Sequence, residues 1–174
     1  MKDSSIKYYD IEVLSVPAGD TIDLVRDDNC AIYECPATGA FKSRGKKHPL
    51  FMAFRERNNN GRMTHLYKIQ KVLSADLDDE NFLMDSAKMN EERKGSKCSS
   101  LWKRIDYYKR NNKNANKGGL RWIFVIDVEN SIELPFPAEF ESTRGMAGEV
   151  HLTIKEFFGH PTEEGVVMIK HKKM

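Results

Sequence analysis

A chain of 174 residues, with 40% hydrophobic and 31% charged residues and a net charge of +2, has the size and composition of one folded domain. This composition excludes a disordered chain, and no apolar run is long enough to span a membrane. No apolar leader follows Met1, so we expect a cytoplasmic protein, and three cysteines, an odd number, argue against a disulfide framework. We therefore expect a single domain over residues 1–174 with no membrane contact.

The first part of the chain predicts short strands separated by turns. Ile6–Val16 is rich in apolar residues and predicts a first strand, over its whole length or over its second half. The alternation in Thr21–Arg26 indicates a short edge strand, and Cys30–Glu34 predicts a strand that stops at Pro36. The polar and basic sequence of Ala37–Pro49 is typical of a loop.

The clearest pattern is Leu50–Val72, which predicts a β-hairpin. Two runs with period-two alternation flank Asn58–Gly61, and Asn and Gly supply the positive φ that a tight hairpin needs. In the first run, Leu50, Met52 and Phe54 share one face, and Arg55 and Arg57 lie on the opposite face. We therefore expect both arginines to point outward.

A basic insert follows the hairpin, at about residues 86–119. Before it, the acidic segment Ser74–Asp85 predicts a short helix or a turn over the core. Within the insert, Leu101–Arg110 predicts a helix because its apolar residues recur at helical spacing along one face.

The last third of the chain begins with Leu120–Val128, whose near-continuous apolar run predicts a central strand buried on both faces. Glu129–Ser131 predicts a turn, and a short extension should end at Pro135 and Pro137. The remaining expected elements are a strand or helix start at Glu149–Ile154, a helical turn at Ile154–Gly159 and a final strand at Val166–Ile169. Many short strands, few helices and no regular strand–helix alternation predict an α+β, mainly β fold. The expected form is a curved antiparallel sheet or a small barrel with one or two inserted helices.

The charges are distributed in blocks. Residues 42–71 and 88–121 each carry a net charge of +8, whereas residues 1–41, 72–87 and 122–174 carry −5, −5 and −4. If the two basic blocks meet in space, they form the positive surface expected of a phosphate-binding face. The predicted phosphate contacts are Lys42, Arg44, Lys46, Lys47, Arg55, Arg57, Lys103, Arg104, Lys109, Arg110, Lys113, Lys117 and Arg121.

Aromatic residues are interleaved with these charges. Trp102, Tyr107 and Tyr108 lie among the basic residues of the predicted helix, and aromatic faces can stack on unpaired bases. The simpler interpretation is a lysine-rich solvated surface with aromatic residues in the core.

Other chemistry has less support in the sequence. Cys30 and Cys35 lack the two-residue spacing of common zinc sites, so we expect free thiols, no metal and no cofactor. Asp76, Asp78, Asp79 and Glu80 form an acidic cluster that could bind a cation, although a solvated loop explains it more simply. No nucleophile elbow or phosphate-cradling glycine loop is present, so the sequence favours binding over catalysis.

Three strand-like segments resemble those of a known family. Phe51–Arg55, Leu66–Ile69 with Val72, and Phe124–Asp127 are similar to strand motifs of small PUA-like β-barrels, including the EVE type. The resemblance covers roughly residues 30–128. It implies a module that binds DNA or RNA, sometimes with a modified base in an aromatic pocket, and similar barrels occur as accessory domains in bacterial restriction and defence proteins.

Three hypotheses follow for the function. The first is a non-catalytic nucleic-acid-binding module, which we place in a defence or restriction system. The second is a protein-interaction or oligomerisation module that uses the acidic segment 72–87, with Trp102, Tyr107 and Tyr108 as anchors. The third is a metal-dependent nuclease or other hydrolase that uses the acidic cluster.

Overall fold

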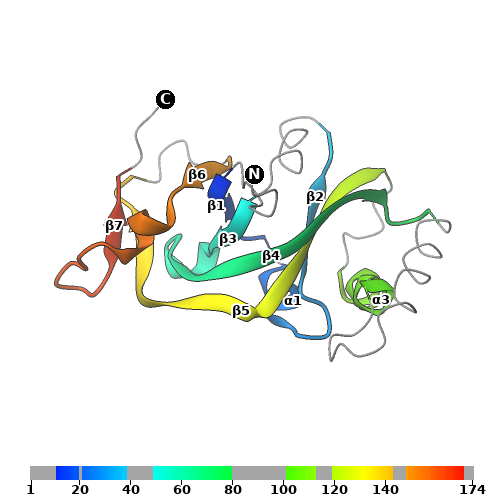
Figure 1. Cartoon of the computed structure of the whole chain (residues 1–174), viewed down its shortest axis with the longest axis horizontal. Coiled ribbons are helices and arrows are strands. Elements are labelled where there is room, and N and C mark those ends of the chain that lie inside the picture. Colours follow the sequence, from blue (N-terminus) through cyan, green and yellow to red (C-terminus); the bar gives the residue numbers. More distant parts are fainter. Residues whose placement is uncertain are drawn as a thin grey trace, which may run out of the picture. The chain divides into compact units, whose positions relative to one another are not determined.

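The structure is a computed structural model that describes residues 11–19, 21–38, 49–79, 101–112, 119–142 and 148–170 (Figure 1). In these ranges no helix has the length and apolar character that crossing a membrane requires. The chain divides into two compact units. Unit 1 comprises Met1–Pro17, Lys47–Leu66 and Glu133–Met174, and unit 2 comprises Ala18–Lys46 and Tyr67–Ile132. The expectation of a single domain stays a prediction.

Strands dominate the described residues. The elements are β1 (Ile11–Pro17), α1 (Ile22–Arg26), β2 (Ile32–Pro36), β3 (Pro49–Arg55), the 3-10 helix η3 (Arg57–Asn59), β4 (Met63–Asp76), α3 (Leu101–Asn111), β5 (Leu120–Phe140), β6 (Val150–Leu152), the 3-10 helix η4 (Ile154–Phe158) and β7 (Val167–Ile169). Six of the seven strands follow the order β2-β5-β4-β3-β1-β6, and β7 pairs with β5 off this path. The predicted α+β, mainly β class is confirmed.

The sheet is mixed. β1 pairs with β6 and β2 with β5 in antiparallel fashion, whereas β1 pairs with β3 and β5 with β7 in parallel. A parallel pair needs a long crossover connection, and the chain between Pro17 and Pro49 supplies one for β1 and β3. The period-two pattern of a strand does not report its direction, which is why the sequence indicated only antiparallel pairing.

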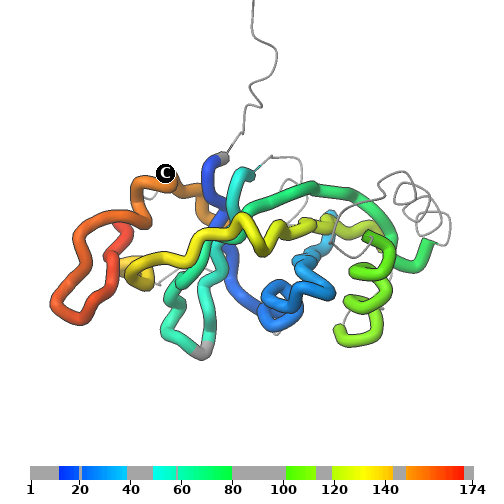
Figure 2. The backbone as a smooth tube through the Cα atoms, turned by 60° about the horizontal axis from the view of Figure 1, so that its bottom comes forward, coloured from blue at the N-terminus to red at the C-terminus, as the bar shows by residue number. Residues whose placement is uncertain are grey.

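The predicted hairpin of unit 1 is confirmed by β3 and the start of β4, which run to a common loop (Figure 2). An antiparallel bridge joins Glu56 to Arg62 across this loop. Asn60 and Gly61 have φ values of 53° and 79°, so both adopt the left-handed conformation that a tight connection requires.

β3 lies between β1 and β4 in the sheet, and its residues are buried on both faces along nearly its whole length. Arg55 is only 7% exposed, so the expectation that it points outward is wrong. Arg57 is exposed, as expected, but it lies in η3 beyond the end of the strand. The alternating pattern predicts two faces for β3, but it does not predict that both are covered.

The predicted edge strand Thr21–Arg26 is instead the helix α1 of unit 2. The N–H groups of Leu24 and Val25 both donate to the carbonyl of Thr21, at 3.1 and 3.2 Å, and Val25 is fully buried. A run of six residues is too short for its periodicity to separate a strand from a helical turn. β2 begins two residues later than predicted and includes Pro36.

β5 extends well beyond the predicted end of the central strand, through the expected turn and past Pro135 and Pro137. Proline fits the φ of a strand and is tolerated wherever its position makes no ladder hydrogen bond, so it does not end a strand by itself. The parallel partner β7 pairs with β5 only from Ala138 onward.

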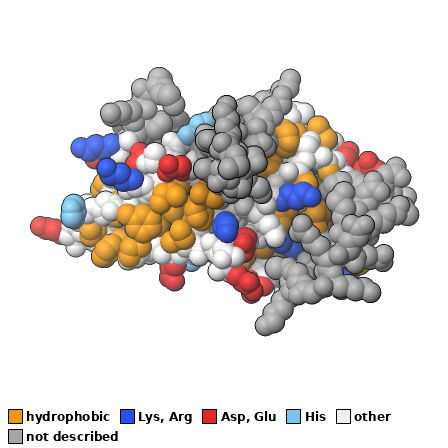
Figure 3. Space-filling view, in the orientation of Figure 1, with side chains coloured by type: hydrophobic (Ala, Val, Ile, Leu, Met, Phe, Trp, Pro, Cys, Tyr) orange, Lys and Arg blue, Asp and Glu red, His pale blue; other side chains and the backbone are white. Residues whose placement is uncertain are grey.

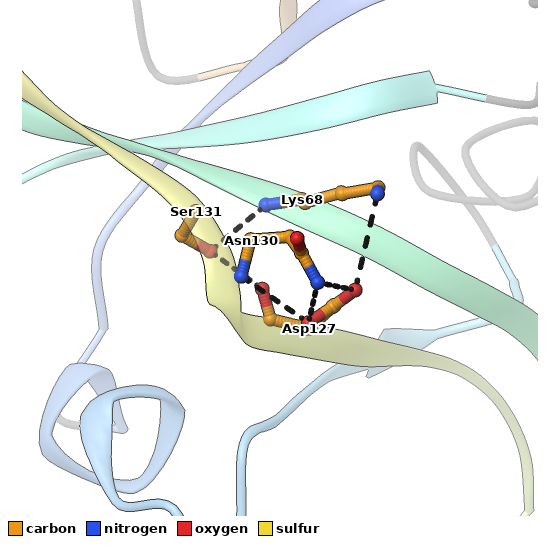
Figure 4. Close-up of polar contacts among 4 residues, drawn as sticks. All are labelled: Lys68, Asp127, Asn130 and Ser131. Atoms are coloured by element: carbon orange, nitrogen blue, oxygen red, sulfur yellow. Dashed lines mark hydrogen bonds and ion pairs between the residues drawn. The ribbon is translucent and has the colours of Figure 1, made fainter.

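Side-chain contacts replace the predicted turn at Glu129–Ser131 (Figure 4). The Ser131 hydroxyl donates to the Asp127 carbonyl at 2.8 Å and accepts the backbone N–H of Lys68 on β4 at 3.1 Å. The Asn130 amide donates to the Asp127 carboxylate, whose other neighbour is the Lys68 ammonium at 3.9 Å. These contacts stabilise the strand locally. The sequence Asp-x-x-Asn-Ser indicates them, although the same residues are also typical of a turn.

In unit 2 the predicted helix at Leu101–Arg110 is confirmed by α3, which continues for one residue more. Ile105 and Tyr108 pack with residues of β2, β4 and β5 in one buried cluster. The Cys30 thiol is part of this cluster and is fully buried. The inner face of α3 is therefore part of the core of this unit.

The C-terminal elements of unit 1 match the expected order. β6 and η4 correspond to the predicted strand and helical turn, and η4 ends before Gly159. Thr153 and Glu156 form a capping box at the start of η4. β1 covers the second half of the predicted first strand, and because residues 6–10 lie outside the described residues, both alternatives for its start stay predictions.

Candidate nucleic-acid interface

Arg104 points from α3 into unit 2. Its guanidinium donates to the backbone carbonyls of Cys30 at 2.6 Å, Ile126 at 2.9 Å and Ala31. The residue is 4% exposed, so these internal contacts occupy the group that the sequence analysis assigned to phosphate. Arg104 anchors α3 to the segment before β2 and to β5, and it cannot reach a ligand on the surface.

Tyr108, one of the three predicted stacking residues, is also internal. It is 1% exposed, and its hydroxyl accepts a hydrogen bond from the Asn112 side chain. Burial, followed by the nearby Glu34 carboxylate, raises the pKa of Tyr108 far above its ordinary range. Its ring belongs to the core and not to a surface that could stack on a base.

Arg121 forms a two-point ion pair with Glu34 across the β2–β5 pair. Nη2 lies 2.7 Å from Oε1, and the two side chains are 15% and 5% exposed. The hydrogen bond to Glu34 raises the pKa of Arg121 above its ordinary value. In this geometry the carboxylate occupies two of the hydrogen-bond donors of the guanidinium, so Arg121 has an internal role.

Arg55 has an internal role in unit 1. It donates to the carbonyl of Gly148, and its guanidinium carbon lies 5.8 Å from the centre of the Phe140 ring. An arginine over an aromatic face is stabilised by a cation–π interaction. These contacts connect the end of β3 to the end of β5 within this unit.

Two further residues of α3 brace the helix at its flanks. The Tyr107 hydroxyl donates to Asp27 at 2.7 Å, which lowers the pKa of Asp27 and raises that of Tyr107. The Lys109 ammonium donates to the carbonyl of Leu77 at 2.8 Å and lies 3.2 Å from the Asp78 carboxylate. Both side chains are therefore engaged with the rest of unit 2.

The outer face of α3 carries three further predicted residues, Trp102, Lys103 and Arg110, together with Asp106. Trp102 is 39% exposed, which is unusual for so large an apolar side chain, and Lys103 is exposed too. The Arg110 side chain is 76% exposed and pairs with Asp106, one helical turn earlier, at 2.8 Å. An exposed pair of this kind is weak, so Arg110 stays available to an anion.

The other predicted lysines and arginines have no described environment. Lys42, Arg44, Lys46, Lys47, Lys113 and Lys117 lie outside the described residues. On the face drawn in Figure 3, the described lysines and arginines are interspersed with hydrophobic and acidic side chains. That the two basic blocks meet in space stays a prediction.

The acidic cluster is engaged in local contacts. Asp76 accepts the N–H groups of Asp78 at 3.0 Å and Gly119 at 3.1 Å, and Asp78 pairs with Lys109. Glu80 lies outside the described residues. Within the described part of the chain, no three His, Cys, Asp or Glu side chains are grouped so that they could hold a metal ion.

No protein-family model and no curated protein matches this sequence. Among solved structures, a crystal structure of a mutant ZmASCH protein from Zymomonas mobilis is similar, with a TM-score of 0.36 and 8% sequence identity. The alignment covers 69% of this chain and 70% of that chain. The mainly β sheet is the part of the expected PUA-like architecture that the structure shares. The finer resemblance to EVE-type domains stays a prediction, and the function proposed below rests on the residues of this chain.

Proposed function

We propose that this protein is a non-catalytic nucleic-acid-binding module that contacts phosphates through the outer face of α3 and the basic sequence on either side of it. The observation that supports this proposal is the exposure of Lys103 and Arg110 on one helix face. They lie in the segment 88–121, which carries a net charge of +8. Binding by such a segment gains free energy from the counterions that phosphates release.

The proposed phosphate contacts include only some of the basic residues that the sequence predicts. Arg55, Arg104 and Arg121 are excluded because their guanidinium groups lie inside the two units. Lys103 is exposed and makes no hydrogen bond or ion pair with any residue that the structure describes. The basic residues Lys42, Arg44, Lys46, Lys47, Lys113 and Lys117 are included in the proposal because of the sequence alone.

The test is a binding panel measured by fluorescence anisotropy. Labelled single- and double-stranded DNA and RNA are titrated at about 50 and 200 mM salt, the range over which phosphate contacts lose most of their affinity. Each arm is repeated with and without magnesium. We expect binding that weakens steeply with salt and does not need magnesium, and binding to none of the four ligands at low salt would overturn the proposal. Cleavage of a labelled strand only with magnesium would favour the hydrolase alternative instead.

A matched pair of double variants locates the contacts. Lys103→Glu with Arg110→Glu should weaken binding and lower the slope of log affinity against log salt by about 2, because each lost phosphate contact removes nearly one unit. Lys155→Glu with Lys170→Glu makes the same change in net charge at exposed positions of unit 1. Equal losses in both pairs would show a general charge effect and would contradict the role of α3.

These observations do not test the remaining predictions. A place in a defence or restriction system, a cytoplasmic location and a preference for DNA or RNA stay predictions of the sequence and of the family resemblance. The interaction-module alternative is kept because Trp102 is exposed, and measuring the oligomeric state over a range of protein concentrations tests it.

A further inference from the structure

We infer that the outer face of α3 is a site for single-stranded nucleic acid, in which one unpaired base stacks on Trp102 while Lys103 and Arg110 hold phosphates beside it. This inference rests on the function proposed above and adds the class of ligand and the residue that selects it. Trp102 and Lys103 are adjacent in the chain at the start of the helix, and Arg110 lies two turns farther along the same face.

Among the three candidate stacking residues of α3, Trp102 combines an exposed ring with no hydrogen bond to any residue that the structure describes. Tyr108 is buried at 1% exposure, and Tyr107 is held by its hydroxyl bond to Asp27. Trp102 keeps 39% of its surface exposed. A large apolar ring left in water next to a cation has the two properties that a stacking platform for a base requires.

The inner face holds this platform rigidly. Arg104 connects α3 to three backbone carbonyls, and Lys109 and Tyr107 brace its two flanks. A base that stacks on Trp102 therefore meets a helix that is already in place, and binding costs less conformational entropy. The internal contacts of Arg104 and Lys109 thus hold the helix that carries the exposed residues.

The same face suits a single strand better than a duplex. Bases of a duplex are stacked on one another, so they must be flipped out before a surface tryptophan can stack on them. Asp106 lies between Trp102 and Arg110 on the same stripe of the helix, and its carboxylate pairs with the Arg110 guanidinium at 2.8 Å. A single strand can pass beside Asp106 with its base on Trp102 and its phosphates on the cations.

The test uses the fluorescence of Trp102. Trp122→Phe leaves Trp102 as the only tryptophan, and it removes no hydrogen bond because the buried Trp122 Nε1 has no partner in the described part of the chain. Titration with single-stranded oligonucleotides, with blunt duplexes of the same length for comparison, should quench Trp102 in parallel with the rise in anisotropy. If Trp122→Phe lowers the stability, the difference between wild type and Trp102→Phe gives the same signal.

Trp102→Ala should weaken single-strand binding about 10-fold, as expected for the loss of one stacked base. It should leave the weaker duplex binding nearly unchanged, and Trp102→Phe should restore part of the affinity. Phe158→Ala is the matched control, because Phe158 is an aromatic residue of unit 1 with 49% exposure, and it should bind like the wild type.

The failure of this inference and the failure of the proposed function give different results. Salt-dependent binding with unchanged Trp102 emission, with full affinity in Trp102→Ala, or with equal affinity for duplexes would overturn the stacking site and leave the proposed function standing. No binding at low salt would overturn both. A shift of Trp102 emission with protein concentration alone would identify a protein contact on this face and also overturn the inference.

Discussion

The two faces of α3 carry similar residues and use them differently. Lys103 and Arg104 are neighbours with the same charge, yet Lys103 is exposed while Arg104 is 4% exposed and bonded to three carbonyls. Trp102 and Tyr108 differ in the same way, at 39% and 1% exposure. On this helix the face on which a residue lies, and not its type, determines whether it has a structural or a surface role.

The largest effect should come from the inner face. Arg104→Ala removes a charged donor from three buried carbonyls, so we expect the free energy of unfolding to fall by about 3 kcal/mol. Urea unfolding followed by circular dichroism measures this loss. Lys103→Ala, its neighbour on the outer face, should change stability by no more than about 0.5 kcal/mol. Similar losses in the two variants would contradict the division of α3 into two faces.

A pH-dependent effect should come from the thiol beneath the inner face. Burial is the largest cause that raises the pKa of Cys30 from 9.0 to about 11. The unfolded thiol ionises first as the pH rises, so this contribution to stability is complete below pH 9.0 and is lost as the pH approaches about 11.

Cys30→Ala should therefore give a flatter stability profile than the wild type over this alkaline range. The difference between the two profiles, measured by urea unfolding, isolates the thiol from other groups that titrate there. Parallel profiles would show that the thiol is not shielded by α3.

A smaller effect should come from the flank of the helix. The bond from Tyr107 is the largest cause that lowers the pKa of Asp27, so Asp27 stabilises the fold above its unfolded pKa. That contribution is lost as the pH falls through the folded pKa. Tyr107→Phe should return the pKa of Asp27 toward its ordinary value, which a carboxyl-detected NMR titration measures. An unchanged Asp27 titration would remove Tyr107 from the brace and return its ring to the candidates for stacking.

The smallest effect should come from the outer face. Arg110→Ala breaks an exposed pair with Asp106 one helical turn away, and such pairs contribute about 0.3 kcal/mol. Thermal unfolding at low salt should therefore hardly distinguish this variant from the wild type. A loss as large as that of Arg104→Ala would show that Arg110 has an internal partner.

Local patterns in the sequence predicted the elements whose cause is itself local. The spacing of apolar residues in α3 and the Asn58–Gly61 turn between β3 and β4 both act within a few residues, and both are confirmed. Thr21–Arg26 failed because a run of six residues fits two periods. The predicted strand is shorter than β5 because Glu129–Ser131 has the composition of a turn and Pro135 was expected to end the extension, although a strand can accommodate proline.

The candidate site was harder to predict because burial depends on distant residues. Nothing near Arg104 in the sequence indicates that carbonyls from Cys30, Ala31 and Ile126 surround its guanidinium. The partner of Arg121 is Glu34, which is also far away along the chain. Helical spacing could have given one signal, since Arg104 lies one turn before the buried Tyr108 on the apolar face of the helix.

The parallel pairing of β1 and β3 has a consequence for the order of folding. Its register joins Ile11 to Pro49 and Pro17 to Arg55, so the pair can form only after the whole connection between the strands has closed. The β3–β4 hairpin closes through a loop of a few residues and loses far less chain entropy. We therefore expect β3 to join β4 early, with β1 docking later on the edge that the hairpin leaves open. Substitutions in β1 should then speed unfolding and leave the refolding rate nearly unchanged.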